Sequence, residues 1–330
     1  MSRVSVLGDG GWGTALSLIL ESGGHDVTLW SVFPEYAAIL AEKRENVKFL
    51  PGISLPEGLK ITADTKQVLG ADLIIVAVPT KFIRAVLERF PDGFGSGTDV
   101  ISVAKGIEHD TLMRPTEIIR ELAGCVPGVL CGPSHAEEVA RSLPAAIVAA
   151  AEDGALADRT QALFAGGALR VYTSTDLIGV ELGGAFKNVI AIAAGICDGL
   201  ELGDNAKSAV MTRGLEEMSR LGAAMGAQRS TFFGLSGIGD LITTCTSPFG
   251  RNRQVGIRLG RGEKLNDIPA QTATVAEGVL TAGSVCTLAD RHGVEVPISR
   301  EVNAVAFEGK PPMEAVSALM SRDTSAEFFN

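Results

Sequence analysis

Hydrophobic positions in the first half of the chain alternate between short apolar runs and longer amphipathic stretches. Several of the short runs are apolar throughout, as is typical of strands in a parallel sheet with both faces covered. Strands are expected at residues 3–7, 26–31, 72–78, 99–104, 128–131 and 145–150. Helices are expected between them at residues 34–45, 80–90, 114–124 and 155–165. The pattern predicts a doubly wound α/β domain, whose ligand should lie at the carboxyl ends of the strands.

The alternation stops near residues 171–176, and the rest of the chain carries few strand signals. Helices are expected there at residues 177–197, 205–226, 231–246, 251–261, 276–292, 298–308 and 312–321. A chain of 330 residues is long enough for about two domains. We therefore expect a Rossmann domain at residues 1–176 and an all-helical substrate and catalytic domain at residues 177–330.

A glycine-rich turn joins the first expected strand to a helix. Gly8, Gly10 and Gly13 form the spacing G-x-G-x-x-G, and Gly23 ends the helix before the second strand. The first glycine permits a tight turn, the second lets a pyrophosphate approach the backbone, and the third lets helix and strand pack closely. Free N–H groups and the helix dipole then hold the anion. In this context the motif predicts a dinucleotide site rather than a purely structural turn.

Composition and charge indicate which binding partners and which cellular compartment the protein is suited to. A net charge of −10 argues against nucleic acid or an anionic membrane as the main partner. Five cysteines without C-x-x-C spacing indicate reduced thiols in a cytoplasmic protein, and the four histidines show no metal-ligand spacing. Asp9 and several glycines interrupt the apolar N-terminal stretch, which therefore predicts a strand and a turn rather than a signal peptide. We expect no metal and no stable membrane insertion.

Candidate residues in the first domain follow the expected strands. Pro79 lies where the ribose of a nicotinamide cofactor would pass, although an ordinary strand terminator explains it equally well. Lys105 follows a buried strand and points into the predicted crevice, whereas a lone lysine in such a place is usually solvated. Ser134 follows Gly132 and can cap the next helix, with Glu137 at capping-box spacing. Contact with substrate or cofactor is compatible with that cap.

In the second domain, Lys187 and Asn188 interrupt a helix of small and apolar residues, where an unpaired charge is costly. The alternative is a lysine that extends its amine to solvent. A desolvated lysine near another cation, for which Lys105 is a candidate, has a lowered pKa and can exchange a proton. Asp240 is either a helix N-cap or a buried partner of Lys187, and Thr244 lies on the same helical face as Asp240.

Arg251 and Asn252 follow Pro248 at the start of an expected helix. Guanidinium and amide donors at a helix N-terminus suit a phosphate group. A basic, solvated turn is the alternative. The pair is therefore a candidate site for the phosphate of a small substrate.

Ordered motifs cover nearly the whole chain. They are G-x-G-x-W-G-T-A (8–15), L-P-G-I (50–53), A-V-P (77–79), A-K-G-I-E (104–108), G-P-S (132–134), G-V-E-L-G-G-A-x-K-N-V-I-A-I-A-A-G (179–195), G-D-N-A-K (203–207), T-R-G-L-x-E-M (212–218), G-x-G-D-L-x-x-T-C-T-S-P (237–248), R-N-R (251–253) and V-x-E-G (275–278). Together they resemble the motifs of NAD(P)-dependent glycerol-3-phosphate dehydrogenases. The resemblance implies a Rossmann domain with a helical domain of the 6-phosphogluconate dehydrogenase-like type. It also implies reversible hydride transfer between NAD(P)H and dihydroxyacetone phosphate. The product, sn-glycerol 3-phosphate, would serve glycerophospholipid synthesis.

The resemblance also implies residue roles. Lys187 would be the general acid and base at the C2 oxygen, Lys105 an electrostatic and substrate contact, and Asp240 the carboxylate that partners the catalytic lysine. The implied substrate-binding residues are Lys105, Gly132, Ser134, Lys187, Asn188, Asp240, Thr244, Gly250, Arg251 and Asn252. The implied cofactor-binding residues are Gly8, Gly10, Gly11, Trp12, Gly13, Val32, Phe33, Pro79, Lys105, Ala136, Arg251, Val275 and Glu277.

The chain departs from the family pattern at several positions. Gly250 stands where bacterial members commonly have serine, Gly11 where serine is frequent, and His135 before Ala136 where an aromatic residue is usual. After the second strand, residues 31–33 contain neither the basic residues that hold a 2′-phosphate nor the acid that favours NAD. The cofactor is therefore expected to be NAD or NADP, with the preference open.

Two other functions remain as alternatives. A β-hydroxyacid dehydrogenase would carry asparagine four residues after the helical lysine, but Ala191 is there. A non-catalytic NAD(P)-binding sensor would have lost its chemistry, yet Lys187, Asp240 and Arg251 are all present. The small-residue helices of the second domain suit either a homodimer or packing within one chain.

Overall fold

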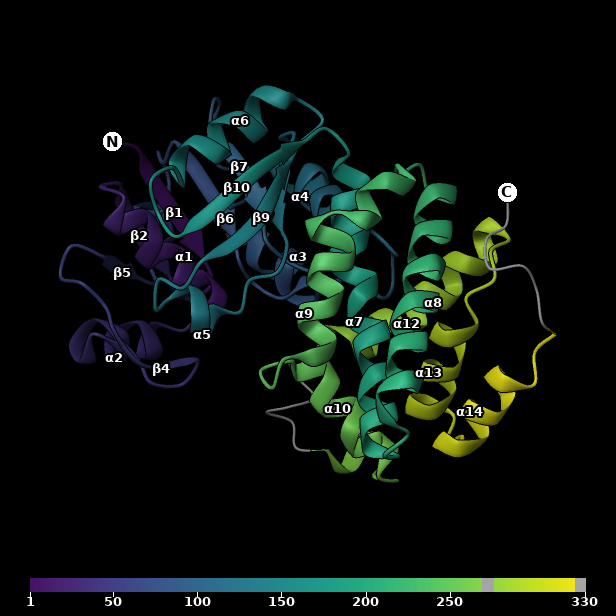
Figure 1. Ribbon diagram of the computed structural model, residues 1–330. Coiled ribbons are helices and arrows are strands. Elements are labelled where there is room, and N and C mark those ends of the chain that lie inside the picture. Colours follow the sequence, from purple (N-terminus) through teal and green to yellow (C-terminus); the bar gives the residue numbers. More distant parts are fainter. Residues whose placement is uncertain (269–275, 324–330) are drawn as a thin grey trace. The chain divides into compact units, whose positions relative to one another are not determined.

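The computed structural model describes residues 1–268 and 276–323 and divides into two compact units (Figure 1). The first unit comprises Met1–Ala185 and Gly222–Asp240, and the second comprises Phe186–Leu221 and Leu241–Asn330.

An eight-stranded sheet forms the centre of the first unit. Its strands are β1 (Arg3–Leu7), β2 (Asp26–Trp30), β5 (Lys60–Thr62), β6 (Leu73–Val76), β7 (Asp99–Ser102), β8 (Gly128–Cys131), β9 (Ala145–Ala150) and β10 (Leu169–Ser174). Their spatial order is β10-β9-β8-β7-β6-β1-β2-β5. β1 lies between β2 and β6, so the strand order reverses beside β1, as in a doubly wound fold. A separate hairpin joins β3 (Glu45–Asn46) to β4 (Leu50–Ser54).

The sheet is not parallel throughout, which corrects one expectation. β9 pairs antiparallel with β8, and β10 then pairs parallel with β9. A parallel pair needs a crossover that returns the chain to the starting end of the sheet. Between β8 and β9 there is only the four-residue helix α5 (Ala136–Val139), so the chain turns back directly.

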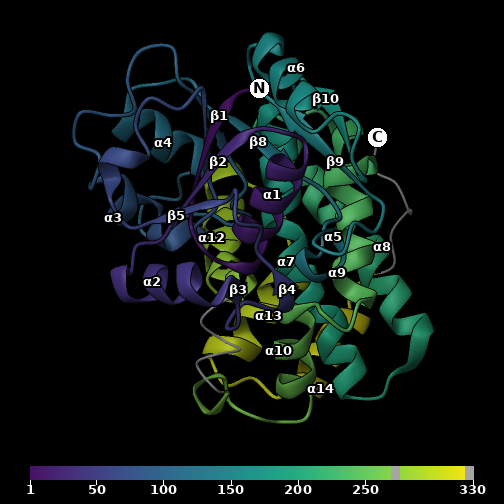
Figure 2. The same cartoon turned by 90° about the vertical axis from the view of Figure 1, so that its left-hand side faces the viewer.

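Helices cover both faces of this sheet (Figure 2). On one face, alternate β1 and β2 residues such as Val6 and Leu29 pack with α1 (Gly11–Ser22), α2 (Pro34–Lys43) and α6 (Gly154–Leu163). On the other face, Leu7 and Trp30 share a cluster with α3 (Ile83–Leu87) and α4 (Pro115–Ala123). The short helices η1 (Thr65–Gln67) and η2 (Thr80–Phe82) lie in connections. The predicted doubly wound architecture is confirmed.

The second half of the chain is helical, as predicted. Its helices are α7 (Leu177–Gly199), α8 (Gly203–Ala224), α9 (Asp240–Thr246), α10 (Arg251–Gly260), η5 (Leu265–Asp267), α12 (Glu277–His292), α13 (Pro297–Phe307) and α14 (Pro312–Met320). The helix expected at 231–246 is instead η3 (Arg229–Phe233), a π-helical turn η4 (Leu235–Gly239) and α9. Gly234, at the junction of η3 and η4, has an extended backbone, which interrupts the α-helix.

The compact units do not follow the predicted boundary between residues 176 and 177. The first turns of α7 belong with the sheet, because Leu177 and Val180 pack against Val129 and Glu181 accepts hydrogen bonds from Thr116. The predicted boundary marks the change from alternating to helical structure, and as a domain limit it stays a prediction.

α7 is long and apolar enough to cross a membrane, but 94% of its most apolar window is buried within the protein. Such burial is typical of a core helix. Among the described residues, α7 is the only helix of this kind.

Four glycines let α7 and α10 approach each other at backbone distance. Gly195 and Gly199 on α7 face Gly256 and Gly260 on α10. A Cβ atom at Gly256 would overlap the carbonyl oxygen of Ile192, and one at Gly260 would lie 2.6 Å from the carbonyl oxygen of Ile196. Only hydrogen fits at these positions, so any larger side chain must separate the two helices.

We expect Gly256→Ala to destabilise the protein, although alanine is the better helix former. Overpacking against a backbone carbonyl should lower the free energy of unfolding by about 1–3 kcal/mol. Thermal unfolding of the purified variant measures this. Gly154→Ala is the matched control, because a Cβ there meets nothing within 4 Å, and its stability should be unchanged or slightly raised. Equal melting temperatures for the two variants would contradict the role of the glycine contact.

A buried carboxylate joins α8 to α13. Glu217 accepts hydrogen bonds from the backbone N–H groups of Ile298 (2.6 Å) and Ser299 (3.2 Å) and from the hydroxyl of Ser299 (3.1 Å). Burial raises the pKa of Glu217 to about 7, despite these hydrogen bonds, which lower it. The native state therefore holds a proton there over a pH range in which the unfolded chain releases it.

Because the pKa of Glu217 is raised in the folded state, we expect stability to fall as pH rises from about 4.5 to about 7. The full effect of this group is on the order of 3 kcal/mol, from 1.36 kcal/mol per pKa unit. Glu217→Gln carries no titrating proton and should flatten this part of the profile. Melting temperatures at pH 5 and pH 8 for both proteins test the expectation. A variant with the same pH slope as the parent would refute it.

Candidate active site

The turn between β1 and α1 has a physical requirement for glycine at two positions. Gly8 has φ of +122°, and a Cβ there would lie 3.0 Å from the carbonyl carbon of Ala77. A Cβ at Gly13 would overlap the carbonyl oxygen of Gly8. A side chain at Gly8 would press against the residues that follow β6, and one at Gly13 would push α1 away from the turn.

The N-terminus of α1 fits the pyrophosphate of a dinucleotide. The first hydrogen bond of the helix runs from Thr14 N to Gly10 O, so the N–H groups of residues 11–13 have no acceptor within the helix. Gly10 provides no capping side chain, no acid lies in the first turn, and a Cβ at Gly10 would meet nothing within 4 Å. Donors, dipole and space at this turn therefore all suit an anion.

Other residues predicted for the cofactor lie around this turn. A Cβ at Gly11 would lie 3.5 Å from the Cβ of Ala136, the first residue of α5. Pro79 follows β6 and precedes η2. The indole N–H of Trp12 is buried and has no hydrogen-bond acceptor among the described residues.

Ser31, Asp9 and Asn46 form a hydrogen-bonded cluster at the end of β2, next to Val32 and Phe33 in the sequence. Ser31 Oγ donates to Asp9 Oδ2 at 2.6 Å. Asn46, which the sequence reasoning missed, donates to the carbonyl of Asp9 at 2.7 Å and is fully buried. Burial raises the pKa of the Asp9 carboxyl, and the hydrogen bond from Ser31 lowers it.

Lys105, Gly132 and Asp240 come together at the ends of β7 and β8. Lys105 Nζ donates to Asp240 Oδ2 at 2.8 Å and to the carbonyl of Gly132 at 2.9 Å. Cys131 Sγ lies 3.9 Å from the same carboxylate oxygen. Gly132 has φ of +149°, and a Cβ there would lie 2.8 Å from Ile147 Cα, so glycine is required. Asp240 is 2% exposed, and its carboxylate forms an ion pair with Lys105.

The capping box expected at Ser134 is wrong. α5 begins at Ala136, its N-cap is His135, and no side chain caps it. Ser134 Oγ donates instead to the carbonyl of Gly132 at 3.0 Å, because the turn ends one residue later than expected. Ser134 therefore stabilises the same turn that holds Lys105.

In the second unit, α7 carries Lys187 towards α9. Lys187 is 5% exposed, and its Nζ donates to Thr244 Oγ1 at 2.6 Å. This burial argues against an amine that extends to solvent. The sequence placed Thr244 on the same helical face as Asp240, and both residues do lie on α9. The direct contact of Thr244 with Lys187 was not predicted. The predicted pairing of Asp240 with Lys187 stays a prediction.

Asn188 and Asn252 connect α7, α10 and α12. Asn252 Nδ2 donates to Asn188 Oδ1 at 2.9 Å, and Gly278 N donates to Asn252 Oδ1 at 3.0 Å. The backbone donor of Gly278 fixes which atom of the Asn252 amide is oxygen. Glu277, the first residue of α12, is adjacent, while Val275 lies outside the described residues.

Arg251 and Gly250 lie at the N-terminus of α10. Arg251 is exposed and is the first helical residue, with Gly250 as N-cap. A Cβ at Gly250 would lie 2.6 Å from the carbonyl oxygen of Thr244. The serine that is common in bacterial members of the resembled family would not fit here unless the chain shifts.

The sequence reasoning missed an ionic cluster beside this helix. Asp198 Oδ2 accepts from Arg253 Nε at 2.6 Å, and Asp198 Oδ1 accepts from Lys207 Nζ at 2.8 Å. Arg253 belongs to the motif R-N-R (251–253) and Lys207 to G-D-N-A-K (203–207). Membership of these motifs was the sequence signal that could have pointed to both residues. Burial raises the pKa of the nearby Cys245 thiol to about 12, although Lys187, Lys207 and Arg253 lower it. The thiol is therefore protonated at neutral pH.

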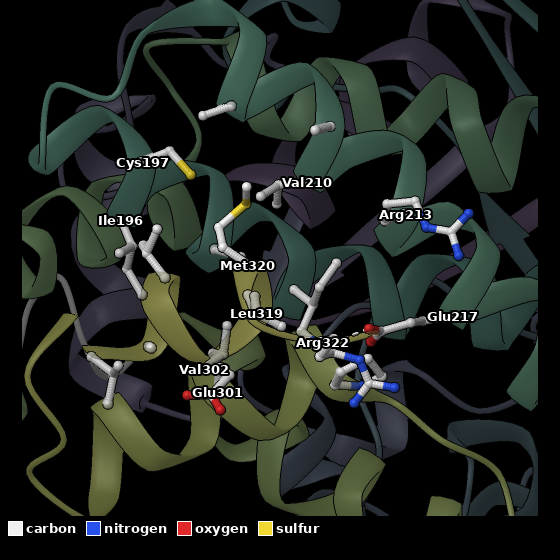
Figure 3. Close-up of a pocket in the computed structure, with 18 of the residues that line it drawn as sticks. Ile196, Cys197, Val210, Arg213, Glu217, Glu301, Val302, Leu319, Met320 and Arg322 are labelled. Atoms are coloured by element: carbon white, nitrogen blue, oxygen red, sulfur yellow. Dashed lines mark hydrogen bonds between the residues drawn. The ribbon is translucent and has the colours of Figure 1, made fainter. Parts of the chain in front are cut away.

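A cavity of about 1140 Å³ lies elsewhere in the second unit, among α7, α8, α13 and α14. Figure 3 shows Ile196, Cys197 and Met320 on one side of it and Arg213 and Arg322 on the other. None of the predicted site residues that the structure describes lines this cavity. It is therefore separate from the candidate catalytic residues.

Comparisons with known proteins agree on one family. The model of the NAD-dependent glycerol-3-phosphate dehydrogenase N-terminus matches residues 3–157, and that of the C-terminus matches residues 176–317. The glycerol-3-phosphate dehydrogenase (NAD(P)+) of Fusobacterium nucleatum is 47% identical over 331 residues, which covers 99% of each chain. That of Agathobacter rectalis is 45% identical over 99% of this chain and 98% of its own. The crystal structure of glycerol-3-phosphate dehydrogenase from Coxiella burnetii has a TM-score of 0.93 at 36% identity, covering 97% of this chain and 99% of that one.

Proposed function

The chain belongs to the NAD-dependent glycerol-3-phosphate dehydrogenase family, and we propose that it transfers a hydride reversibly between NAD(P)H and dihydroxyacetone phosphate. The product is sn-glycerol 3-phosphate. The observation that supports this chemistry most directly is the buried amine of Lys187 on α7, which donates to the hydroxyl of Thr244 on α9. Burying a lysine amine costs free energy, and buried titratable groups of this kind are therefore candidates for functional residues.

The cofactor, NAD or NADP, supplies the hydride. We assign its pyrophosphate to the N-terminus of α1, where the donors and the open space at Gly10 suit an anion. The residues that would hold the cofactor are Gly8, Gly10, Gly11, Trp12, Gly13, Val32, Phe33, Pro79, Lys105, Ala136, Arg251, Val275 and Glu277.

We assign proton transfer to Lys187. Reduction of the ketone places negative charge on the C2 oxygen, and an ammonium group both neutralises that charge and donates the proton. In the reverse direction the neutral amine accepts the proton from the C2 hydroxyl. Thr244 limits the positions that the amine can take, and Asn188 is the neighbouring candidate for a substrate hydroxyl.

We assign Lys105 to electrostatic and substrate contact, and Asp240 to positioning. The bond between Lys105 and Asp240 supports this assignment, because it fixes a cation at the end of β7. The turn at Gly132 and Ser134 would contact the substrate beside that cation.

We assign the substrate phosphate to Arg251 and Asn252, beside Gly250. Arg251 is exposed at the first position of α10, where a guanidinium and a helix N-terminus both attract an anion. The bonds of Asn252 to Asn188 and Gly278 hold its amide in place.

We also propose that the protein acts in the cytoplasm and supplies the glycerol backbone for glycerophospholipid synthesis. All five cysteines are free, which suits a reducing compartment. We further propose that the chain can form a homodimer, for which the small-residue helices of its second half are suited.

The test of this function is a paired assay of NADH and NADPH oxidation with dihydroxyacetone phosphate. We expect turnover with at least one cofactor and strict dependence on the ketone phosphate, because the site carries an acid, an anion site for the cofactor and candidate phosphate ligands. Dihydroxyacetone without phosphate is the matched control and should react far more slowly. No turnover with either cofactor would defeat the proposal.

Lys187→Ala should lower kcat by about 10²–10⁴-fold, the usual contribution of general acid–base catalysis, with cofactor affinity nearly unchanged. Lys187→Met, which keeps more of the buried volume, should lose activity to a similar extent. Steady-state kinetics and cofactor titration measure both effects. Arg251→Ala is the comparison variant, since it should chiefly raise KM for dihydroxyacetone phosphate. If Lys187→Ala stayed within a few-fold of the parent kcat, the assigned proton transfer would be wrong.

A further inference from the structure

NADPH differs from NADH only by a phosphate on the 2′ oxygen of the adenosine ribose. In Rossmann domains, residues at the end of the second strand contact this 2′ group. In this sheet Leu7 and Trp30 are register partners, and Gly8 N donates to the carbonyl of Trp30 at 2.9 Å. The residues after Trp30 therefore lie against the glycine-rich turn. A ribose attached to a pyrophosphate at that turn meets them.

No exposed carboxylate stands among residues 31–33. Ser31 is fully buried, and its hydroxyl donates to Asp9 and accepts from the backbone N–H of Phe33. The Asp9 carboxyl behind it is 8% exposed, burial raises its pKa, and the ammonium of Lys48 is close enough to lower it. A 2′-phosphate at this place would therefore not meet the acid with which NAD-selective sites end β2.

A guanidinium from another part of the chain reaches the end of β2. Arg89, just after α3, is exposed, and its Nη1 donates to the carbonyl of Val32 at 3.3 Å, across 57 residues of sequence. Its Cζ lies 6.0 Å from the centre of the Trp30 ring. These two contacts anchor the guanidinium beside residues 31–33.

Most of the hydrogen-bonding capacity of Arg89 is available to a ligand. A guanidinium has five N–H donors, and the contact with Val32 uses one of them. Within residues 1–268 and 276–323, Arg89 forms no ion pair with a carboxylate. An arginine with this freedom matches the geometry of a phosphate, which it binds through two parallel hydrogen bonds.

We propose that Arg89 binds the 2′-phosphate of NADPH and so determines whether this chain accepts that cofactor. The proposal rests on the proposed dehydrogenase function, since it concerns the cofactor of the same site. NADH places a hydroxyl where NADPH places the phosphate, so its binding does not depend on Arg89.

Fluorescence titration of the full-length protein with NADPH, NADH and adenosine 2′,5′-bisphosphate tests the proposal. Arg89→Gln should raise Kd for NADPH and for adenosine 2′,5′-bisphosphate by about ten-fold or more, and Kd for NADH by less than about two-fold. Arg89→Lys, which keeps the charge but loses the planar pair of donors, should fall between the parent and Arg89→Gln for NADPH.

Arg170→Gln is the matched control. Arg170 is an exposed arginine on β10, at the opposite edge of the same sheet, and its replacement should leave every Kd unchanged. An unchanged NADH affinity in Arg89→Gln also shows that the variant is folded.

Three outcomes would overturn the proposal: equal changes for both cofactors, no change for NADPH, or a parent protein that binds NADH but not NADPH. These outcomes leave the dehydrogenase function intact if NADH is still oxidised with dihydroxyacetone phosphate. Conversely, a selective loss of NADPH binding in a protein that reduces no ketone phosphate would support Arg89 and defeat the proposed function.

Discussion

The close approach of backbones at glycine is the constraint on which both candidate sites depend. α7 carries Lys187 and Asn188, and α10 begins with Arg251 and Asn252, so the glycine contact between these helices sets the distance between their polar groups. In the first unit, Gly8 and Gly13 bring the N-terminus of α1 onto the sheet in the same way. Glycine contributes no chemistry at these places, yet its absence of a side chain determines where the donors and the amine lie.

The sequence predicts much of this fold, because local patterns carry it. The apolar runs locate β1, β8 and β9 to the residue, and the helical periodicity locates α7, α10 and α12 within two residues. The strand β10 was missed because it is a short edge strand with alternating burial that follows the last clear α/β repeat. The antiparallel direction of β9 was missed because strand direction depends on the connection between strands, which apolar patterning does not report.

The candidate residues were also predictable as types, but their partners were not. Lys105 and Asp240 are 135 residues apart in sequence, and Asp198 meets Arg253 across 55. Spacing along the chain says which residues share a helix face, whereas such pairs arise only when distant elements pack. The same holds for the proposed cofactor contact, since residues 31–33 lack a basic side chain and Arg89, which lies just after α3, reaches Val32 across 57 residues of sequence.

One hydrogen bond of each lysine bears on its proposed role. Lys105 donates to the carboxylate of Asp240, and a carboxylate partner stabilises the charged ammonium. Lys187 donates to the hydroxyl of Thr244, which can accept a hydrogen bond from an ammonium and donate one to a neutral amine. That contact therefore persists in both protonation states, so the amine keeps its position while its charge changes. A group that gives up and regains a proton in each turnover can use such a partner, and this contact supports the proposed assignment of proton transfer to Lys187.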